Sequence, residues 1–390
     1  MSHESVRTSA VSTEISRTTQ RPATRPGPEI SPLHVGDPDF ATPDFITAAQ
    51  ADSVRNGYTH YAQPQGDPEL RAALATDLTS RSCRDYRREQ VIVTGGGSPA
   101  ISASILATVN PGDRVLVPSP TYSLYADSTR MARGIPELLP PGAGGRVDLE
   151  LLEERAPGAR MIVLCQPGNP RGDIYRRDEL EAIGAIADRH DLLILSDEAY
   201  DHIVYAGASF TSTLQIDSMH DRLIYCQTFS KTFAMTGWRI GYVAAPPDVA
   251  PAVGLMHRTF SGPVNSAVQR SALVAVTSNS TWPAERLLDY ERRRQMTLHA
   301  LEGIPGTTFV EPDGAFYVFV KYRHDLTSAD FVRHAHSWGV GVRSGSEFGP
   351  AGEGHIRIAF CVEDAALRVG LERLRRALTA HCAGDVAAAG

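Results

Sequence analysis

The sequence predicts an α/β protein whose mainly parallel sheet is covered by helices on both faces. Short, continuously apolar runs alternate with helical periodicity over residues 90–244, which is typical of parallel strands joined by helical crossovers. A chain of 390 residues is also too long for one small core, so we expect two packed domains.

The apolar runs give the expected strands of the main sheet. These strands are residues 90–94, 114–117, 161–165, 192–196, 222–226 and 240–244, and helices are expected at residues 99–109 and 177–190. Because ligands of open α/β sheets bind at the carboxyl ends of the strands, the loops that follow them should meet in one crevice. Those loops are residues 95–98, 119–122, 167–172, 197–200 and 228–231.

A different pattern after residue 265 predicts a smaller α+β domain. Residues 265–302 are expected to be helical, with the charge run at residues 291–294 facing solvent. Strands are expected at residues 307–310, 315–320 and 355–360, and helices at residues 328–338 and 363–381. We expect a large domain over residues 61–285, a small domain from residues 31–60 with 286–390, and a flexible arm over residues 1–30.

Composition narrows the class of protein. A net charge of −7 argues against a nucleic-acid partner, which a basic surface would favour. No apolar run approaches the roughly 20 residues that span a bilayer, and no hydrophobic leader is visible, so we expect a cytoplasmic protein without a membrane partner. The five cysteines are scattered without CxxC spacing and are expected to be reduced thiols. No cluster has metal-ligand spacing, so no metal is expected.

The segment TFSKTFAMTGWRIGY, residues 228–242, carries the most specific pattern. Lys231 lies where an apolar strand turns, and Arg239 follows eight positions later. A lysine amine can form an imine with an aldehyde, while a guanidinium and nearby hydroxyls can hold a phosphate. The segment resembles the signature of the fold-type I enzymes that use pyridoxal 5′-phosphate (PLP). It is most similar to class I/II aminotransferases of the aspartate aminotransferase group.

This resemblance implies that Lys231 holds PLP as a Schiff base and that Thr228, Ser230 and Arg239 contact its phosphate. Thr228 stands where the family more often has Ser, but the hydroxyl is retained. The resemblance covers about residues 33–381 and implies the PLP transferase fold type I. That fold has a mainly parallel seven-stranded sheet in a large domain and a smaller α+β domain.

Three further residues match family positions around the cofactor ring. Asp197, in SDEAY, matches the aspartate that pairs with the ring nitrogen and keeps it protonated, so that the ring can accept electrons. Tyr200 and Asn169 match the residues that contact the ring oxygen O3′. Alone, Asp197 would be interpreted as a helix N-cap and Asn169 as part of a turn. Arg171 replaces the usual Thr of the PGNPRG turn.

The glycine turn before residue 99 resembles the family's phosphate site. Gly97 and Ser98 are expected to contact the phosphate, since backbone amides at a helix start bind anions. Pro99 departs from the usual Gln or Glu but is tolerated in a first helical turn. Tyr122, in SPTYSLY, matches the aromatic residue that stacks on the ring. In isolation it would be interpreted as a core tyrosine.

The remaining matches concern the substrate and a second subunit. Arg357 and Gly36 match the groups that bind the substrate α-carboxylate, a task that suits a bidentate guanidinium, and Asn169 is expected to contact the substrate as well as the cofactor. Tyr61 matches a tyrosine that reaches the phosphate of the neighbouring subunit, which implies a homodimer. The loop at residues 342–349 departs from the family's Pro-Gly at Ser344.

The implied function is an aminotransferase that moves an amino group between an L-amino acid and a 2-oxo acid. In the family this proceeds through a Lys231 aldimine and a quinonoid intermediate. The same first steps also serve lyases and synthases that eliminate, cyclise or substitute, so this alternative stays open. An effector-binding module of a transcription regulator is set aside, because residues 1–30 are too short and polar for a DNA-binding domain.

The substrate itself is left open by the sequence. Arg171, Arg258 and His202 are candidates for binding an acidic substrate side chain only because they lie near site loops in the sequence. A core or surface role fits each of them equally well.

Overall fold

The computed structural model describes residues 30–323 and 325–387, so the expected arm at residues 1–30 falls outside it except for its last residue. The main sheet has seven strands in the order β1-β7-β6-β5-β4-β2-β3, and β7 alone among them is antiparallel to its neighbours. This confirms the mainly parallel seven-stranded sheet. The strands are β1 (Val91–Thr94), β2 (Arg114–Pro118), β3 (Ile135–Leu139), β4 (Ala159–Cys165), β5 (Leu193–Asp197), β6 (Leu223–Thr228) and β7 (Gly241–Ala244).

Both faces of this sheet are buried, as the continuous apolar runs require. Along β5, Leu195 packs into the core of one face and Ile194 into the core of the other, because successive side chains point to opposite faces. The first face is covered by α4 (Gly97–Thr108), α5 (Leu124–Met131) and α9 (Ala250–Ser261). The second is covered by α3 (Pro68–Arg81), α6 (Leu149–Arg155), α7 (Arg177–Arg189) and α10 (Ser266–Thr277).

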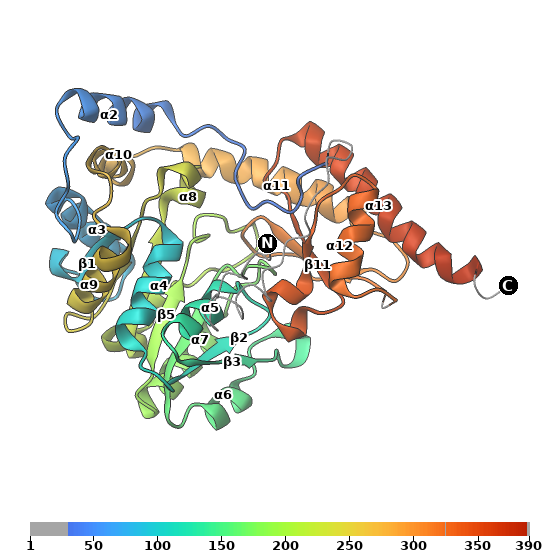
Figure 1. Ribbon diagram of the computed structural model, residues 1–390, viewed down its shortest axis with the longest axis horizontal. Helices are drawn as coiled ribbons and strands as arrows, with labels where there is room; N and C mark the ends of the chain where they lie inside the picture. The colour runs from blue at the N-terminus through green and yellow to red at the C-terminus, as the bar shows by residue number, and fades with distance from the viewer. Residues whose placement is uncertain (1–29, 324, 388–390) are drawn as a thin grey trace, which may run out of the picture.

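The second unit, orange to red in Figure 1, lies beside the main sheet and has its own core. Its antiparallel sheet has the order β10-β11-β9-β8. The strands are β8 (Thr308–Phe309), β9 (Tyr317–Lys321), β10 (Arg343–Ser344) and β11 (His355–Ala359), with helices α11 (Trp282–Leu301), α12 (Ser328–Ser337) and α13 (Asp364–Ala387).

Two expectations for residues 265–302 are corrected. The segment is not one helix: α10 ends at Thr277 and α11 begins at Trp282, where a proline in the first turn favours a helix start. The charge run does not face solvent throughout, because Arg293 is buried. Its guanidinium donates to both carboxylate oxygens of Asp39, at 2.7 and 2.9 Å, and to Asp364 at 2.9 Å. These two carboxylates compensate the buried charge.

The segment before α3 connects the two units. Leu33 packs in the core of the small unit, whereas Ile46 of α2 (Asp44–Arg55) packs in a core of the main sheet, and α2 contacts α10. The expectation that all of residues 31–60 pack with the small unit therefore does not hold for α2. In the described part of the chain, none of the helices combines the length and apolar character needed to cross a bilayer.

Candidate active site

A cavity of about 420 Å³ opens at the carboxyl ends of β4, β5 and β6, where the sequence predicts the crevice. The small unit closes its other side with residues of β9, β10 and β11. All the predicted site residues except Tyr61 line this cavity. They are Gly36, Gly97, Ser98, Tyr122, Asn169, Asp197, Tyr200, Thr228, Ser230, Lys231, Arg239 and Arg357. Tyr61 is 94% exposed and lies outside it.

Lys231 sits on the short helix α8 (Phe229–Thr232), which follows β6 directly. The Thr228 hydroxyl caps this helix by accepting from the Ser230 N–H at 3.2 Å. The Lys231 Nζ donates to the carbonyl of Gly36 at 2.7 Å. Burial lowers the pKa of the Lys231 amine, although the Cys361 thiol and the Asp37 carboxylate act in the opposite direction. A lowered pKa favours the neutral, nucleophilic amine.

Asp197 ends β5 and is buried. Its Oδ2 accepts from the Tyr125 hydroxyl at 2.7 Å, and its Oδ1 accepts from the Ala199 N–H at 3.2 Å. Burial raises the pKa of Asp197, while these two hydrogen bonds and the Lys231 charge oppose that rise. A cationic ring nitrogen is the partner that such a carboxylate would stabilise. Tyr125 was not predicted; its signal in the sequence is only a second tyrosine in SPTYSLY.

Tyr200 and Arg357 meet around Tyr317, a second residue that the sequence reasoning missed. The hydroxyls of Tyr200 and Tyr317 are 2.9 Å apart, and the Arg357 guanidinium lies 4.2 Å from the centre of the Tyr317 ring. Arg357 also donates to Asn169 Oδ1 at 2.9 Å. A Cβ on Gly36 would come within 2.2 Å of the Tyr317 hydroxyl, so this close approach requires glycine.

The residues expected to hold a phosphate lie together at the start of α4. The Thr228 hydroxyl donates to the Ser230 hydroxyl at 2.9 Å, and Gly97 packs against Thr228. A Cβ on Gly96, whose φ is 113°, would lie 2.9 Å from an Arg239 nitrogen. Backbone amides at a helix start, hydroxyls and a guanidinium suit a phosphate dianion. Together with Lys231 and Asp197, this donor set fits PLP.

Glu198, directly after Asp197, is a buried carboxylate that the sequence reasoning did not single out. Burial raises its pKa, and hydrogen bonds from Ser212 and Thr213 oppose that rise. Its oxygens accept five hydrogen bonds, from the hydroxyls of Ser196, Ser212 and Thr213, the N–H of Thr213 and the amide of Gln166. Glu198 thus fixes the turn that carries Asp197 and Tyr200.

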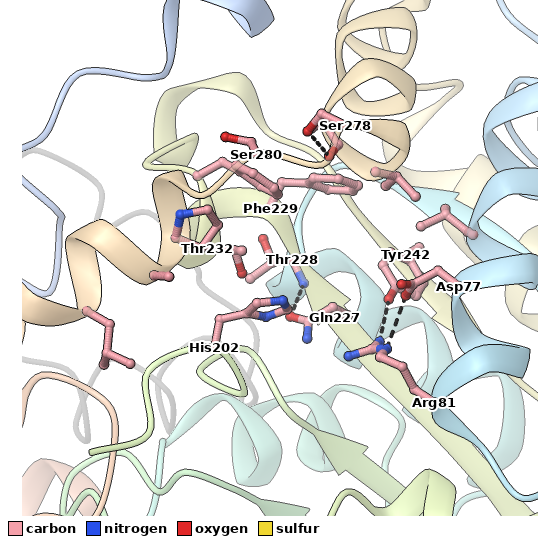
Figure 2. A pocket seen from close by; sticks show the side chains of 17 residues that line it. Asp77, Arg81, His202, Gln227, Thr228, Phe229, Thr232, Tyr242, Ser278 and Ser280 are labelled. Carbon is pink, nitrogen blue, oxygen red and sulfur yellow. Dashed lines mark hydrogen bonds and ion pairs between the residues drawn. The ribbon is translucent and has the colours of Figure 1, made fainter. Parts of the chain in front are cut away.

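Among the described residues that line the cavity, none of the three sequence candidates for an acidic substrate group is present. Arg171 points toward Gly145, with its Nε 3.5 Å from Asp173, and Arg258 is exposed on α9. Figure 2 shows His202 in a different cavity, of about 460 Å³, which Thr228 also lines. There the His202 Nδ1 lies 2.6 Å from the Asp201 Oδ1.

A mainly parallel sheet, with Lys231, Asp197 and Arg239 lining the cavity at its carboxyl edge, is the arrangement of the fold-type I enzymes that use PLP. The family described as aminotransferase class I and II matches residues 28–374. An aspartate aminotransferase of Streptomyces avermitilis is 34% identical, over 88% of this chain and 88% of its own. A bifunctional aspartate and glutamate/aspartate-prephenate aminotransferase of Petunia hybrida is 33% identical, over 89% and 76%. The chain belongs to the class I and II aminotransferases.

Solved structures agree with this assignment. An aromatic aminotransferase from Pyrococcus horikoshii superposes with a TM-score of 0.87 at 31% identity, over 95% of this chain and 99% of its own. An aspartate aminotransferase from Thermotoga maritima gives a TM-score of 0.83 at 29% identity, over 94% of both chains. The protein is therefore a PLP-dependent aminotransferase acting on amino and 2-oxo acids. The lyase or synthase alternative is not favoured.

Proposed function

We propose that Lys231 binds the cofactor covalently and moves the substrate proton during amino-group transfer. The observation that carries this proposal is that one cavity holds the buried Lys231 amine together with Asp197, Arg239 and Arg357. When bound, PLP supplies an electron sink that stabilises negative charge at the substrate Cα. The protein supplies the positioning, the charges and the acid–base group.

In this proposal the cofactor is held at both ends by residues of the main sheet. Gly97, Ser98, Thr228, Ser230 and Arg239 hold the phosphate through amides, hydroxyls and a guanidinium. Asp197 would keep the ring nitrogen protonated, Asn169 and Tyr200 would contact the ring oxygen O3′, and Tyr122 would pack against the ring. The hydrogen bond from Tyr125 holds the Asp197 carboxylate directly. The five hydrogen bonds that Glu198 accepts hold the turn in which Asp197 lies.

The substrate is bound by the small unit and the connecting segment. Arg357 pairs with the α-carboxylate, and the backbone of Gly36 contacts it as well. The neutral Lys231 amine, favoured by its lowered pKa, takes the Cα proton and later returns a proton to the acceptor carbon. The same groups, in reverse order, convert the 2-oxo acid.

We further propose a cytoplasmic homodimer in which Tyr61 reaches the phosphate of the neighbouring site. Its side chain is 94% exposed in a single chain, which suits contact with a second copy. Relatives are named as aspartate, glutamate/aspartate-prephenate and aromatic-amino-acid aminotransferases, so the donor is proposed to be aspartate, glutamate or an aromatic L-amino acid.

Replacing Lys231 tests the proposal directly. Lys231→Ala should abolish covalent attachment of PLP, because no other amine lies in the cavity among the described lining residues. Borohydride reduction followed by intact-protein mass spectrometry measures the attachment. Lys321→Ala, which removes an exposed lysine on β9, is the matched control and should retain it. A Lys231→Ala protein that still carries the reduced cofactor would contradict the assignment.

The wild-type enzyme also separates transamination from elimination. With an amino donor and no acceptor, one equivalent of 2-oxo acid per site is expected, after which the reaction stops. Oxo acid released over many turnovers without an acceptor would instead indicate a lyase.

A further inference from the structure

The turn between β1 and α4, residues 95–97, consists of three glycines and is held by side chains from elsewhere in the chain. Arg239 packs against Gly96, where a Cβ would lie 2.9 Å from one of its nitrogens. The N–H of Gly95 donates to the Nε2 of His257 on α9, at 3.1 Å. Arg239 already belongs to the proposed phosphate site, whereas His257 has no part in the proposed function. The sequence reasoning did not single out His257 either.

A turn of glycines needs such contacts if its amides are to bind a phosphate. Glycine has no Cβ and loses more conformational freedom on ordering than any other residue. Backbone amides bind an anion well only when they already point toward one place. A contact that orders the turn beforehand increases the affinity, because binding then no longer has to order it. The bond to His257 acts at Gly95, where β1 ends and the turn begins.

The chemistry of the His257 ring suits this task better than it suits a core position. The ring is fully buried, and burial lowers the pKa of His257, so the ring stays neutral and Nε2 remains an acceptor. With Nε2 accepting, the proton lies on Nδ1, which has no hydrogen-bond partner among the described residues. A buried donor without a partner destabilises a fold. Stability alone would therefore favour an apolar side chain here.

We propose that His257 is a positioning residue for the cofactor phosphate, which holds the glycine turn in its binding form by accepting the Gly95 N–H. This inference rests on the proposed placement of the phosphate at Gly97, Ser98 and Arg239. Among the described residues that line the active-site cavity, His257 is absent, so it acts through the turn and not by direct contact.

Binding of PLP and of pyridoxal to the cofactor-free enzyme tests the inference without turnover. Pyridoxal carries a hydroxyl in place of the phosphate, and its aldehyde can still react with Lys231. His257→Leu removes the acceptor with little change in side-chain volume. The dissociation constant for PLP, measured from the visible absorbance of the bound compound, should rise about 3- to 10-fold, the effect of losing one hydrogen bond. The constant for pyridoxal should stay unchanged.

Two amide variants test the acceptor itself. The Oε1 of His257→Gln is as many bonds from Cα as the histidine Nε2, so this variant should bind PLP within about twofold of the wild type. His257→Asn carries the same amide on a side chain shorter by one methylene. It should bind PLP as weakly as His257→Leu does. This pair of variants still decides the question if His257→Leu fails to fold.

His220→Leu is the matched control. His220 lies on the short helix η4 (Asp217–Arg222), remote from the cavity, and burial lowers its pKa as well. Its Nδ1 also lacks a hydrogen-bond partner among the described residues. The variant therefore makes the same chemical change away from the turn. Both dissociation constants should remain those of the wild type.

The outcomes separate the inference from the function on which it rests. An unchanged PLP constant in His257→Leu, or an equal rise for PLP and pyridoxal, would overturn the role of His257. Equal PLP affinity in His257→Gln and His257→Asn would do the same. Arg239→Gln should weaken PLP and leave pyridoxal unchanged. If Arg239→Gln binds PLP as the wild type does, the proposed phosphate site itself is wrong.

Discussion

At the scale of single residues, the site is made of short contacts between segments far apart in the chain. Lys231, Asp197 and Arg239 could be predicted from the sequence because each lies in a motif of fixed spacing. Tyr125 and Tyr317 could not, because their relation to the cavity arises only from packing. Tyr317, for example, reaches Tyr200 across 117 positions of sequence.

Tyr125 gives a prediction at this scale. Tyr125→Phe removes the hydrogen bond to Asp197, which opposes the rise of that carboxyl's pKa, so the carboxylate should hold a protonated ring nitrogen less well. A hydrogen bond to a charged group contributes about 1.5–3 kcal/mol, so the dissociation constant for PLP should rise at least about tenfold. Equilibrium dialysis measures it. Tyr86→Phe, at a buried tyrosine remote from the cavity, is the control. Unchanged PLP affinity in Tyr125→Phe would refute the proposed support of Asp197.

At the scale of elements, the expected strands match the structure to within about two residues where an apolar run is fully buried. β3 and β10 were not predicted. β3 is an edge strand whose Ile135 is 53% exposed, and β10 has only two residues, so neither leaves an apolar run to detect. The residue boundaries proposed for the two domains remain a prediction, except that α2 packs with the main sheet and not with the small unit.

The turn after β5 gives a prediction at the scale of elements. Glu198→Gln places an amide NH₂ where the surrounding groups are mainly donors, so at least one buried hydrogen bond is lost. The free energy of unfolding should fall by about 1–3 kcal/mol. Chemical denaturation of the PLP-free protein measures it. Glu181→Gln, at an exposed position on α7, should change it little. Equal stability of Glu198→Gln and the wild type would show that the network is not needed to hold the turn.

The pair of Asp201 and His202, beside the cavity of Figure 2, predicts a pH dependence. The Asp201 charge raises the pKa of His202. Burial alone would raise the pKa of Asp201, but His202 and Arg81 lower it to about 2. A histidine whose pKa rises on folding stabilises the fold fully below its ordinary pKa, and this contribution disappears as pH rises through the folded value.

The stability lost in His202→Gln should therefore be larger at pH 6 than at pH 9. Denaturation of wild type and variant at both values checks the sign. His299→Gln, at a histidine with an 88% exposed side chain, controls for the loss of a surface histidine. A loss that is the same at pH 6 and pH 9 would contradict the charge pairing.

At the scale of the whole molecule, the two units form one site between them, and the proposed homodimer adds a third contributor. The main sheet provides the residues proposed to hold the cofactor, and the small unit provides Arg357 and Tyr317. Sequence reasoning reached this division because the resemblance spans both units. The buried Arg293 pair with Asp39 and Asp364 was missed, because charge runs usually face solvent.

The proposed dimer predicts complementation between two inactive variants. Lys231→Ala lacks the amine, and Tyr61→Ala lacks the group offered to its neighbour. If sites are shared, mixed dimers hold one complete site, so unfolding and refolding an equal mixture should restore about a quarter of wild-type activity. Lys231→Ala refolded alone is the control. An inactive mixture that nonetheless contains mixed dimers by native mass spectrometry would argue against the sharing of Tyr61.

The connection between Leu33 and Ile46 limits how the sequence can change over time. Leu33 is fixed in one core and Ile46 in the other, and Gly36 lies between them with its carbonyl on Lys231. An inserted or deleted residue here would shift that carbonyl by about 3 Å, the length of one residue. Surface loops usually accept such changes. In related chains, this stretch should therefore keep a constant length even where its residues differ.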